Sequence, residues 1–289
     1  MKASKCILSA FCFAAVANLA MPAMAYEVAP SYEKFGDDSF SQYIKDGVTI
    51  GIVSAPPHSF LNTSNGKAEG VDVEINEAAL KWMGITSIKY EVTPVGQLVP
   101  GLMSKRIDVI GTNIHVTPDR IKAISFTGPS WWYGPIIVLP ANSDLQISSY
   151  ADLKGKKVGA VVGSAADEYL RKIGAESIAF PGAEQEIGAL TTGRVDAVLE
   201  DDVTVVDWLK SNPSLPIKQL KDVPVPEEMI TKYGYGYARY GLRKGDCTFR
   251  AAYTQALAEV RGTGEVSAIL KKYGLSNRNL FLHPLEKNW

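Results

Sequence analysis

The chain has 289 residues, of which 46% are hydrophobic and 21% are charged, with a formal net charge of -1. This composition is that of an ordinary globular protein and excludes a disordered chain, a collagen-like repeat and a disulfide-rich scaffold. Its 30 Lys and Arg residues balance 31 Asp and Glu residues without a basic block, so no nucleic-acid partner is expected.

Residues 1–25 have the organisation of a secretory signal peptide. Two lysines within residues 1–5 precede an apolar run at residues 7–21, and Ala-Met-Ala at residues 23–25 forms a cleavage site. A membrane anchor is the alternative, but the apolar run is short for a membrane span and Pro22 interrupts it. We therefore expect cleavage after residue 25 and a soluble product in a bacterial periplasm.

The cysteine content fits this expectation. Cleavage removes Cys6 and Cys12 and leaves Cys247 as the single thiol, which forms no internal disulfide and no cysteine-based zinc site. The three histidines are too scattered along the chain to suggest a metal site by their spacing. We expect neither a metal nor another cofactor.

From Gly47 onward, short strand patterns alternate with helical patterns. In the first half, the expected strands are residues 48–53, 88–92 and 107–110, and the expected helices are residues 71–83 and 98–104. Alternation of this kind predicts an α/β fold with largely parallel sheets.

The same alternation restarts past the middle of the chain. A strand pattern at residues 155–164 precedes a helical pattern at residues 167–173, and residues 193–199 repeat the pattern of residues 106–110. In open α/β sheets, ligands bind beyond the carboxyl ends of the strands, where polar loops follow these patterns. Two such lobes predict a small-molecule site in the cleft between them.

The segment from Gly111 to Arg120 is the most informative part of the chain. A buried strand ends at its start, and Thr117 and Pro118 then have the residue types of a helix N-cap and a first helical position. Backbone N–H groups and the guanidinium of Arg120 would suit a carboxylate, whereas the alternative is that Arg120 pairs with a surface acid. No phosphate-binding loop, hydrolase elbow or zinc-protease motif occurs, so no catalytic residue is assigned.

Eight short blocks of the sequence occur in a recognisable order. They are residues 56–60, 66–74, 98–102, 108–110, 117–120, 151–159, 193–198 and 242–246. In that order they resemble the polar amino-acid family of periplasmic solute-binding proteins of ABC importers, over about residues 47–275. The resemblance implies a two-lobed, type II-like fold with a ligand cleft between lobes that are joined by two hinge crossings. Lobe 1 would comprise residues 26–137 plus 238–289, and lobe 2 residues 138–237.

The same resemblance implies roles for individual residues. Arg120 matches the arginine that grips the α-carboxylate of the ligand, and Asp201 matches the acid that receives its α-amino group. Ser164 matches the residue of the second lobe that also holds the carboxylate. Thr112 and Asn113, in the loop after the expected strand of the first lobe, are further candidate ligand contacts.

Other positions depart from the pattern of the family. His58 replaces the common Phe or Tyr after the double proline, and His115 stands where Ser or Thr is common; both are candidate ligand contacts, with a structural role as the alternative. Val95 replaces an aromatic residue that stacks on the ligand, and Ser54 lies where relatives for cationic ligands carry an acid. The missing acid argues against lysine, arginine or ectoine-like cations. Trp132 is expected to form a wall of the cleft, although aromatic clusters are usually core.

Together, the residues and the resemblance predict a periplasmic solute-binding protein, without catalytic activity. It would capture an amino acid or a similar small zwitterion as a monomer and deliver it to an inner-membrane ABC permease. An enzyme on the same scaffold is the alternative, for example a dehydratase that uses His115, Glu200 or His58 for proton transfer.

Overall fold

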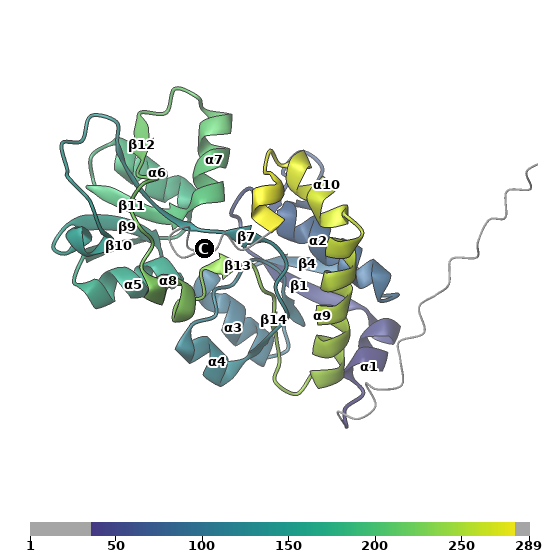
Figure 1. Ribbon diagram of the computed structural model, residues 1–289. Coiled ribbons are helices and arrows are strands. Elements are labelled where there is room, and N and C mark those ends of the chain that lie inside the picture. Colours follow the sequence, from purple (N-terminus) through teal and green to yellow (C-terminus); the bar gives the residue numbers. More distant parts are fainter. Residues whose placement is uncertain (1–35, 281–289) are drawn as a thin grey trace, which may run out of the picture.

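The computed structural model describes residues 36–280, and these form two α/β lobes (Figure 1). The predicted α/β class is therefore confirmed. The predicted signal peptide, residues 1–25, lies outside the described residues, as does His283. Between residues 36 and 280 no helix is both long enough and apolar enough to cross a membrane.

The first lobe is built on a five-stranded sheet in the order β4-β1-β5-β14-β6. Its strands are β1 (Val48–Ile52), β4 (Ile88–Val92), β5 (Val109–Ile110), β6 (Ser125–Phe126) and β14 (Gly241–Leu242). β1 pairs in parallel with β4 and β5, whereas β14 runs antiparallel to β5 and β6. A small hairpin of β2 (Phe60–Leu61) and β3 (Ala68–Glu69) follows β1.

Helices cover both faces of this sheet. One face carries α1 (Ser39–Asp46), α2 (Val71–Trp82), α9 (Cys247–Gly262) and α10 (Glu265–Lys272), and the other carries α3 (Val95–Met103). The short helix α4 (Pro118–Ala123) follows β5, and the 3-10 turn η3 (Asn277–Leu280) ends the described chain. Successive residues of β1 serve the two cores, because side chains alternate along a strand. Ile50 joins the core under α2, while Gly51 lies so close to Leu98 and Ile107 that a Cβ there would clash.

The second lobe is built on the sheet β10-β9-β11-β8-β12. Its strands are β8 (Pro135–Pro140), β9 (Lys157–Val161), β10 (Glu176–Phe180), β11 (Ala197–Asp201) and β12 (Ile217–Gln219). β9, β10 and β11 are parallel, and β8 runs antiparallel to its neighbours. One face packs on α5 (Ala165–Ile173), α8 (Glu227–Thr231) and the 3-10 turn η2 (Tyr150–Leu153), and the other on α6 (Ala183–Thr191) and α7 (Asp202–Ser211).

Two short strands join the lobes. β7 (Trp132–Tyr133) and β13 (Gly236–Tyr237) pair antiparallel between the two sheets (Figure 1). The N–H of Ser130 extends this ribbon by donating to the carbonyl of Ala238 at 2.9 Å. From Pro135 onward the chain already belongs to the second sheet, shortly before the predicted boundary after residue 137. The residue limits of the lobes stay a prediction.

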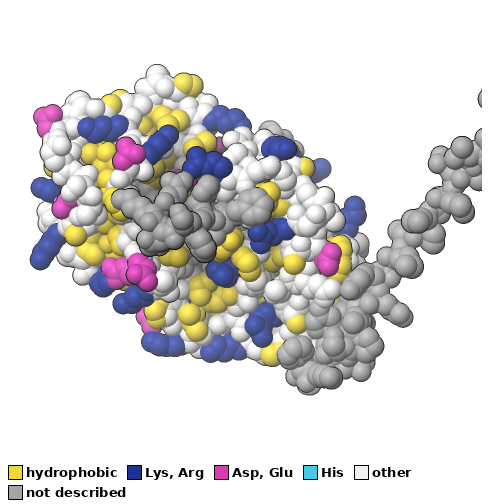
Figure 2. All heavy atoms as spheres, viewed as in Figure 1, with side chains coloured by type: hydrophobic (Ala, Val, Ile, Leu, Met, Phe, Trp, Pro, Cys, Tyr) yellow, Lys and Arg dark blue, Asp and Glu magenta, His cyan; other side chains and the backbone are white. Residues whose placement is uncertain are grey.

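The charged side chains are spread over the surface. Figure 2 shows Lys and Arg side chains scattered over the visible face, interspersed with Asp and Glu, and not gathered into one basic patch. This distribution is consistent with the near-zero net charge of the sequence. The informative charges of this protein lie in its interior.

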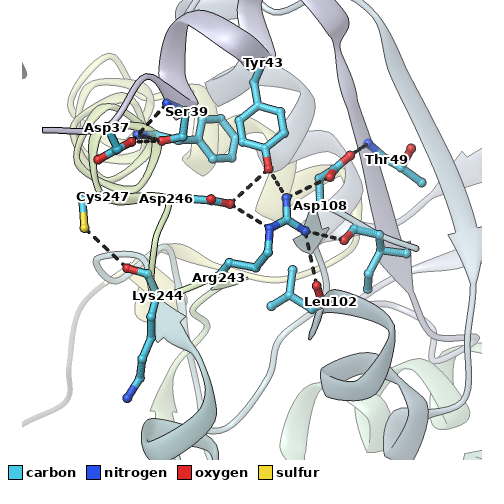
Figure 3. A network of polar contacts seen from close by, with 12 residues as sticks. Asp37, Ser39, Tyr43, Thr49, Leu102, Asp108, Arg243, Lys244, Asp246 and Cys247 are labelled. Carbon is cyan, nitrogen blue, oxygen red and sulfur yellow. Dashed lines mark hydrogen bonds and ion pairs between the residues drawn. The ribbon is translucent and has the colours of Figure 1, made fainter. Parts of the chain in front are cut away.

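One such charge, Arg243, links the outer elements of the first lobe (Figure 3). Its guanidinium donates to the carboxylate of Asp108 at 2.9 Å and to the carbonyl of Ile107 at 2.9 Å. It also pairs with Asp246, just before α9, at 3.2 Å, and contacts the hydroxyl of Tyr43 in α1. The side chains of Arg243 and Asp108 are only 15% and 23% exposed, so this network is largely removed from water.

Replacing Arg243 by methionine should destabilise the protein by about 3 kcal/mol, because Asp108 and Asp246 would stay largely buried without their counter-ion. Lys122→Ala is the control, since it breaks an ion pair with Asp119 whose side chains are 76% and 86% exposed. That change should cost at most about 0.5 kcal/mol. Urea unfolding measures both losses, and equal losses would contradict the structural role of Arg243.

Candidate ligand-binding site

A cavity of about 470 Å³ lies between the two lobes. From the first lobe it is lined by residues that follow β1 and β5 and by the start of α3. From the second lobe it is lined by residues at the ends of β9 and β11 and at the starts of α5 and α6. These strand ends are where open α/β sheets bind ligands, and the volume suits a small molecule.

The carboxylate of Asp201, at the end of β11, reaches the side chains of the other lobe. Its Oδ2 accepts a hydrogen bond from Nδ2 of Asn113 at 3.0 Å and lies 3.3 Å from Nε2 of His58. Its Oδ1 lies 3.8 Å from Nε2 of His115. Asp201 is only 6% exposed, so these contacts occur away from bulk water. One acidic group thus joins three side chains of the first lobe.

A second carboxylate, Asp72, lies on the other side of His58. It is fully buried in the first turn of α2, where the helix dipole favours a negative charge. Its Oδ1 accepts from the indole N–H of Trp131 at 2.7 Å and from the hydroxyl of Tyr240 at 3.0 Å. Its Oδ2 accepts from the N–H of Asn113 at 2.8 Å and lies 3.6 Å from Nδ1 of His58. Donors of the protein itself therefore supply the hydrogen bonds that the Asp72 carboxylate needs.

His58 is a buried cation between these two acids. Burial alone would lower its pKa, but the contacts with Asp201 and Asp72 outweigh this effect and raise the pKa of His58 to about 10. The side chain is only 1% exposed. An imidazolium at neutral pH therefore lines the cavity.

His115 has the opposite character. Burial lowers its pKa to about 4 despite the attraction of Asp201, and the positive charges of Arg120 and His58 act in the same direction as burial. The ring is therefore neutral at pH 7. Among the described residues, Nε2 of His115 has no hydrogen-bond partner. A neutral imidazole nitrogen at the cavity can donate or accept one hydrogen bond with a ligand.

Arg120 lies in the first turn of α4, where the predicted cap is confirmed. Oγ1 of Thr117 accepts from the backbone N–H of Arg120 at 3.4 Å, and Pro118 is the first helical residue. The guanidinium donates to the carbonyl of His115 at 2.9 Å and to the carbonyl of Gly163, in the second lobe, at 2.7 Å. A permanent cation thus lines the cavity and contacts both lobes.

The start of α5 forms the opposite wall. Oγ of Ser164 accepts from the backbone N–H of Asp167 at 3.2 Å, so this hydroxyl caps the helix. Ser164 and Ala166 line the cavity, and the N-terminus of this nine-residue helix favours an anion.

On the first lobe, Thr112 lines the same cavity, and its Oγ1 accepts a hydrogen bond from the hydroxyl of Ser59 at 3.1 Å.

The structure brings seven of the eight predicted contact residues to one cavity. These are His58, Thr112, Asn113, His115, Arg120, Ser164 and Asp201. Trp132 is not among the lining residues; it lies in β7, where its carbonyl accepts from Nδ2 of Asn279 at 3.0 Å. The contact of each of these residues with a ligand stays a prediction. Within residues 36–280 no group of three or more His, Cys, Asp or Glu residues could hold a metal ion.

Tyr235 and Asp72 are among the residues of the site that were not foreseen from the sequence. Tyr235 lines the cavity with its ring centroid 4.0 Å from that of His115. Asp72 supports His58 from behind. The one available signal was an acid flanked by Val71 and Val73 at the start of an apolar helix face.

Comparison with known proteins decides the family. Residues 48–276 match the family model of bacterial extracellular solute-binding proteins, family 3. The chain belongs to this family. The predicted resemblance to solute-binding proteins of ABC importers is therefore confirmed.

Named relatives of this family 3 protein bind amino acids. The histidine-binding periplasmic protein of Salmonella typhimurium is 29% identical over 230 residues, which is 78% of this chain and 86% of that protein. The L-arginine-binding protein of Pseudomonas aeruginosa is 30% identical over 234 residues, which is 78% of this chain and 87% of that protein. A solved ancestral arginine-binding protein bound to arginine has a TM-score of 0.67 and 29% identity, covering 78% of this chain and 97% of its own. The two-lobed periplasmic binding-protein fold is confirmed by this likeness.

This family 3 protein also carries a half-buried carboxyl group, Glu200, at the cavity and a fully buried one, Glu186, next to it. Burial and the charge of Asp201 raise the pKa of Glu200, which lines the cavity, to about 7. Burial and the neighbouring Glu200 raise the pKa of Glu186, in α6 and fully buried, well above its ordinary value. The pair therefore retains at least one proton near neutral pH.

Glu186→Gln should flatten the pH dependence of stability. A carboxyl group whose pKa is raised by folding contributes stability below its unfolded pKa, near 4.5, and this stability is lost as the pH rises through the folded pKa. The unfolding free energy of the wild type should therefore fall from about pH 5 to 8, and that of E186Q should fall less. Urea unfolding across this range gives the slopes. E184Q, at an exposed neighbour, should keep the wild-type slope, and an unchanged slope in E186Q would contradict the assignment.

Proposed function

We propose that this chain captures an amino acid or a similar small zwitterion in the periplasm and delivers it to an inner-membrane ABC permease. The observation that carries the proposal is that one cavity is lined by the cation Arg120 from the first lobe and the carboxylate Asp201 from the second. Opposite charges on opposite lobes suit the carboxylate and the ammonium group of a single ligand. The histidine and arginine named for the relatives support the same ligand class.

We assign the two ends of the ligand from the contacts that the protein already makes. Arg120 donates two N–H bonds to carbonyls, and its other N–H groups suit the ligand carboxylate beside the start of α5. On Asp201, Oδ2 is engaged by Asn113 and His58, whereas Oδ1 has only His115, at 3.8 Å. Oδ1 is therefore the position for the ammonium group. Because each end is held by a different lobe, closure of the lobes completes the site.

We propose that binding occurs without turnover. A dehydratase would need a group that exchanges protons at neutral pH, such as His115, Glu200 or His58. The pKa values of His58 and His115, about 10 and about 4, keep both histidines from exchanging protons near pH 7. Glu200, with a pKa of about 7, is the remaining candidate. The relatives are solute-binding proteins, which favours binding without turnover. The proposal also includes cleavage of residues 1–25 on export and a monomeric mature protein.

A thermal-shift screen of amino acids, opines and compatible solutes against the mature protein should identify the ligand. A true ligand should add about 2.7 kcal/mol of apparent stability at a hundredfold excess over Kd. It should be recovered chemically unchanged after incubation with the protein. Stabilisation by no zwitterion, or conversion of the bound compound, would refute the proposed function.

Removing either charge of the clamp should weaken binding of that ligand. Arg120→Ala and Asp201→Asn should each cost about 2–5 kcal/mol of binding free energy, mostly because the opposite charge is left buried and unpaired. Lys122→Ala is the matched control, since Lys122 lies on the same helix as Arg120 but points into solvent. Calorimetry should show near wild-type affinity for K122A. Unchanged affinity in both R120A and D201N would show that the ligand lies elsewhere.

A further inference from the structure

Four of the charged side chains at the cavity balance one another. Arg120 and His58 are positive, and Asp201 and Asp72 are negative, so these four side chains add no net charge. Glu200 also lines the cavity, and because its pKa is about 7 it is mainly neutral at slightly acidic pH. Glu184, which is exposed, also lines the cavity, so a ligand meets compensated charges at the inner wall and one further carboxylate at Glu184.

The geometry of His58 favours a positive charge, and within the described residues neither ring nitrogen forms a hydrogen bond. Both ring nitrogens face carboxylate oxygens, Nδ1 toward Asp72 at 3.6 Å and Nε2 toward Asp201 at 3.3 Å. A neutral imidazole has one N–H, so its second nitrogen would direct a lone pair at an anion, whereas an imidazolium presents an N–H to each acid at ion-pair distance. The rings of Trp131 and Tyr133, with centroids 5.2 and 5.4 Å from that of His58, hold it in place.

We propose that His58 is a specificity-determining residue. It places a positive charge in the cavity wall, which takes the place of a positive charge on the side group of the ligand. The site therefore accepts amino acids of net charge zero and rejects those of net charge +1. The inference rests on the proposed function, because it concerns the charge of the ligand that the same cavity captures.

The reason is electrostatic. Asp201, to which we assign the ammonium group of the ligand, already faces His58. His58 is only 1% exposed, so a further cation beside it is repelled, since the repulsion of like charges strengthens as the effective dielectric falls. Specificity of this kind comes from a repulsive element as much as from an attractive one. The relative named for L-arginine shows that the fold can take a cationic amino acid, so the discrimination must lie in the residues of this site.

Calorimetry at pH 6.5 with amino acids matched in shape but not in charge tests this inference. Arginine with citrulline, and lysine with glutamine, supply cationic and neutral partners. The wild-type protein should prefer the neutral partner at least tenfold, and His58→Gln should abolish or reverse that preference. His115→Gln is the matched control, because it alters a neutral histidine beside the same Asp201. H115Q should keep the wild-type ratio even where its affinity falls.

The outcomes separate the two proposals. If the wild type binds no member of the panel and no other zwitterion, the proposed function fails and this inference fails with it. If the wild type binds but does not discriminate by charge, or if H58Q keeps the wild-type ratio, only the role of His58 is overturned.

A second measurement needs no variant. The ¹⁵N NMR spectrum of the wild-type protein at pH 8.5 should show both ring nitrogens of His58 protonated, while His115 is neutral. A neutral His58 ring at this pH would overturn the inference even where H58Q does not fold.

Discussion

The carboxylate of Asp201 stands at the end of β11, and three side chains of the opposite lobe, His58, Asn113 and His115, converge on it. The rest of the site depends on this convergence. It links the lobes beside the cavity and leaves Oδ1 of Asp201 with a single contact among the described residues, at 3.8 Å. A buried acid is stable only when its charge is compensated and its oxygens are hydrogen-bonded. Because side chains of the first lobe do this for Asp201, the carboxylate couples the two lobes.

The topology explains why these groups can meet. His58 follows β1, and Asn113 and His115 follow β5, while Asp201 ends β11. The carboxyl ends of parallel strands in each sheet are directed at the cleft, so residues far apart in the chain reach one place. Arg120 adds a second link, because its guanidinium donates to a carbonyl of the other lobe. The ribbon of β7 and β13 holds the lobes together at the side of the cavity where Trp131 and Tyr133 support His58.

Much of this arrangement was predictable from the sequence. The strand and helix periods gave the α/β class, and the Thr-Pro pair gave the cap that positions Arg120. The short helix α3 begins at Val95 and not at residue 98, because the Pro94–Val95 start was hidden in a segment without clear periodicity. The roles expected for Arg120, Asp201 and Ser164 came from the family resemblance, not from their spacing.

The charge states could not be predicted, because they depend on distances between residues that are remote in sequence. His58 and His115 are both buried histidines, yet one is held as a cation and the other is neutral. The difference is that Asp72 and Asp201 flank His58 on both sides, whereas His115 has one carboxylate at a longer distance and lies near Arg120. Only the folded structure shows that Asp72, in α2, is the acid that decides this outcome.

The most direct test of this account is a crystal structure of the mature protein with the zwitterion that stabilises it most. We expect one ligand in the cavity between the lobes, with its carboxylate at the guanidinium of Arg120 and its ammonium group at Oδ1 of Asp201, while Oδ2 stays with Asn113 and His58. A ligand bound outside this cavity, or one whose ammonium group displaces His58 from Asp201, would contradict it.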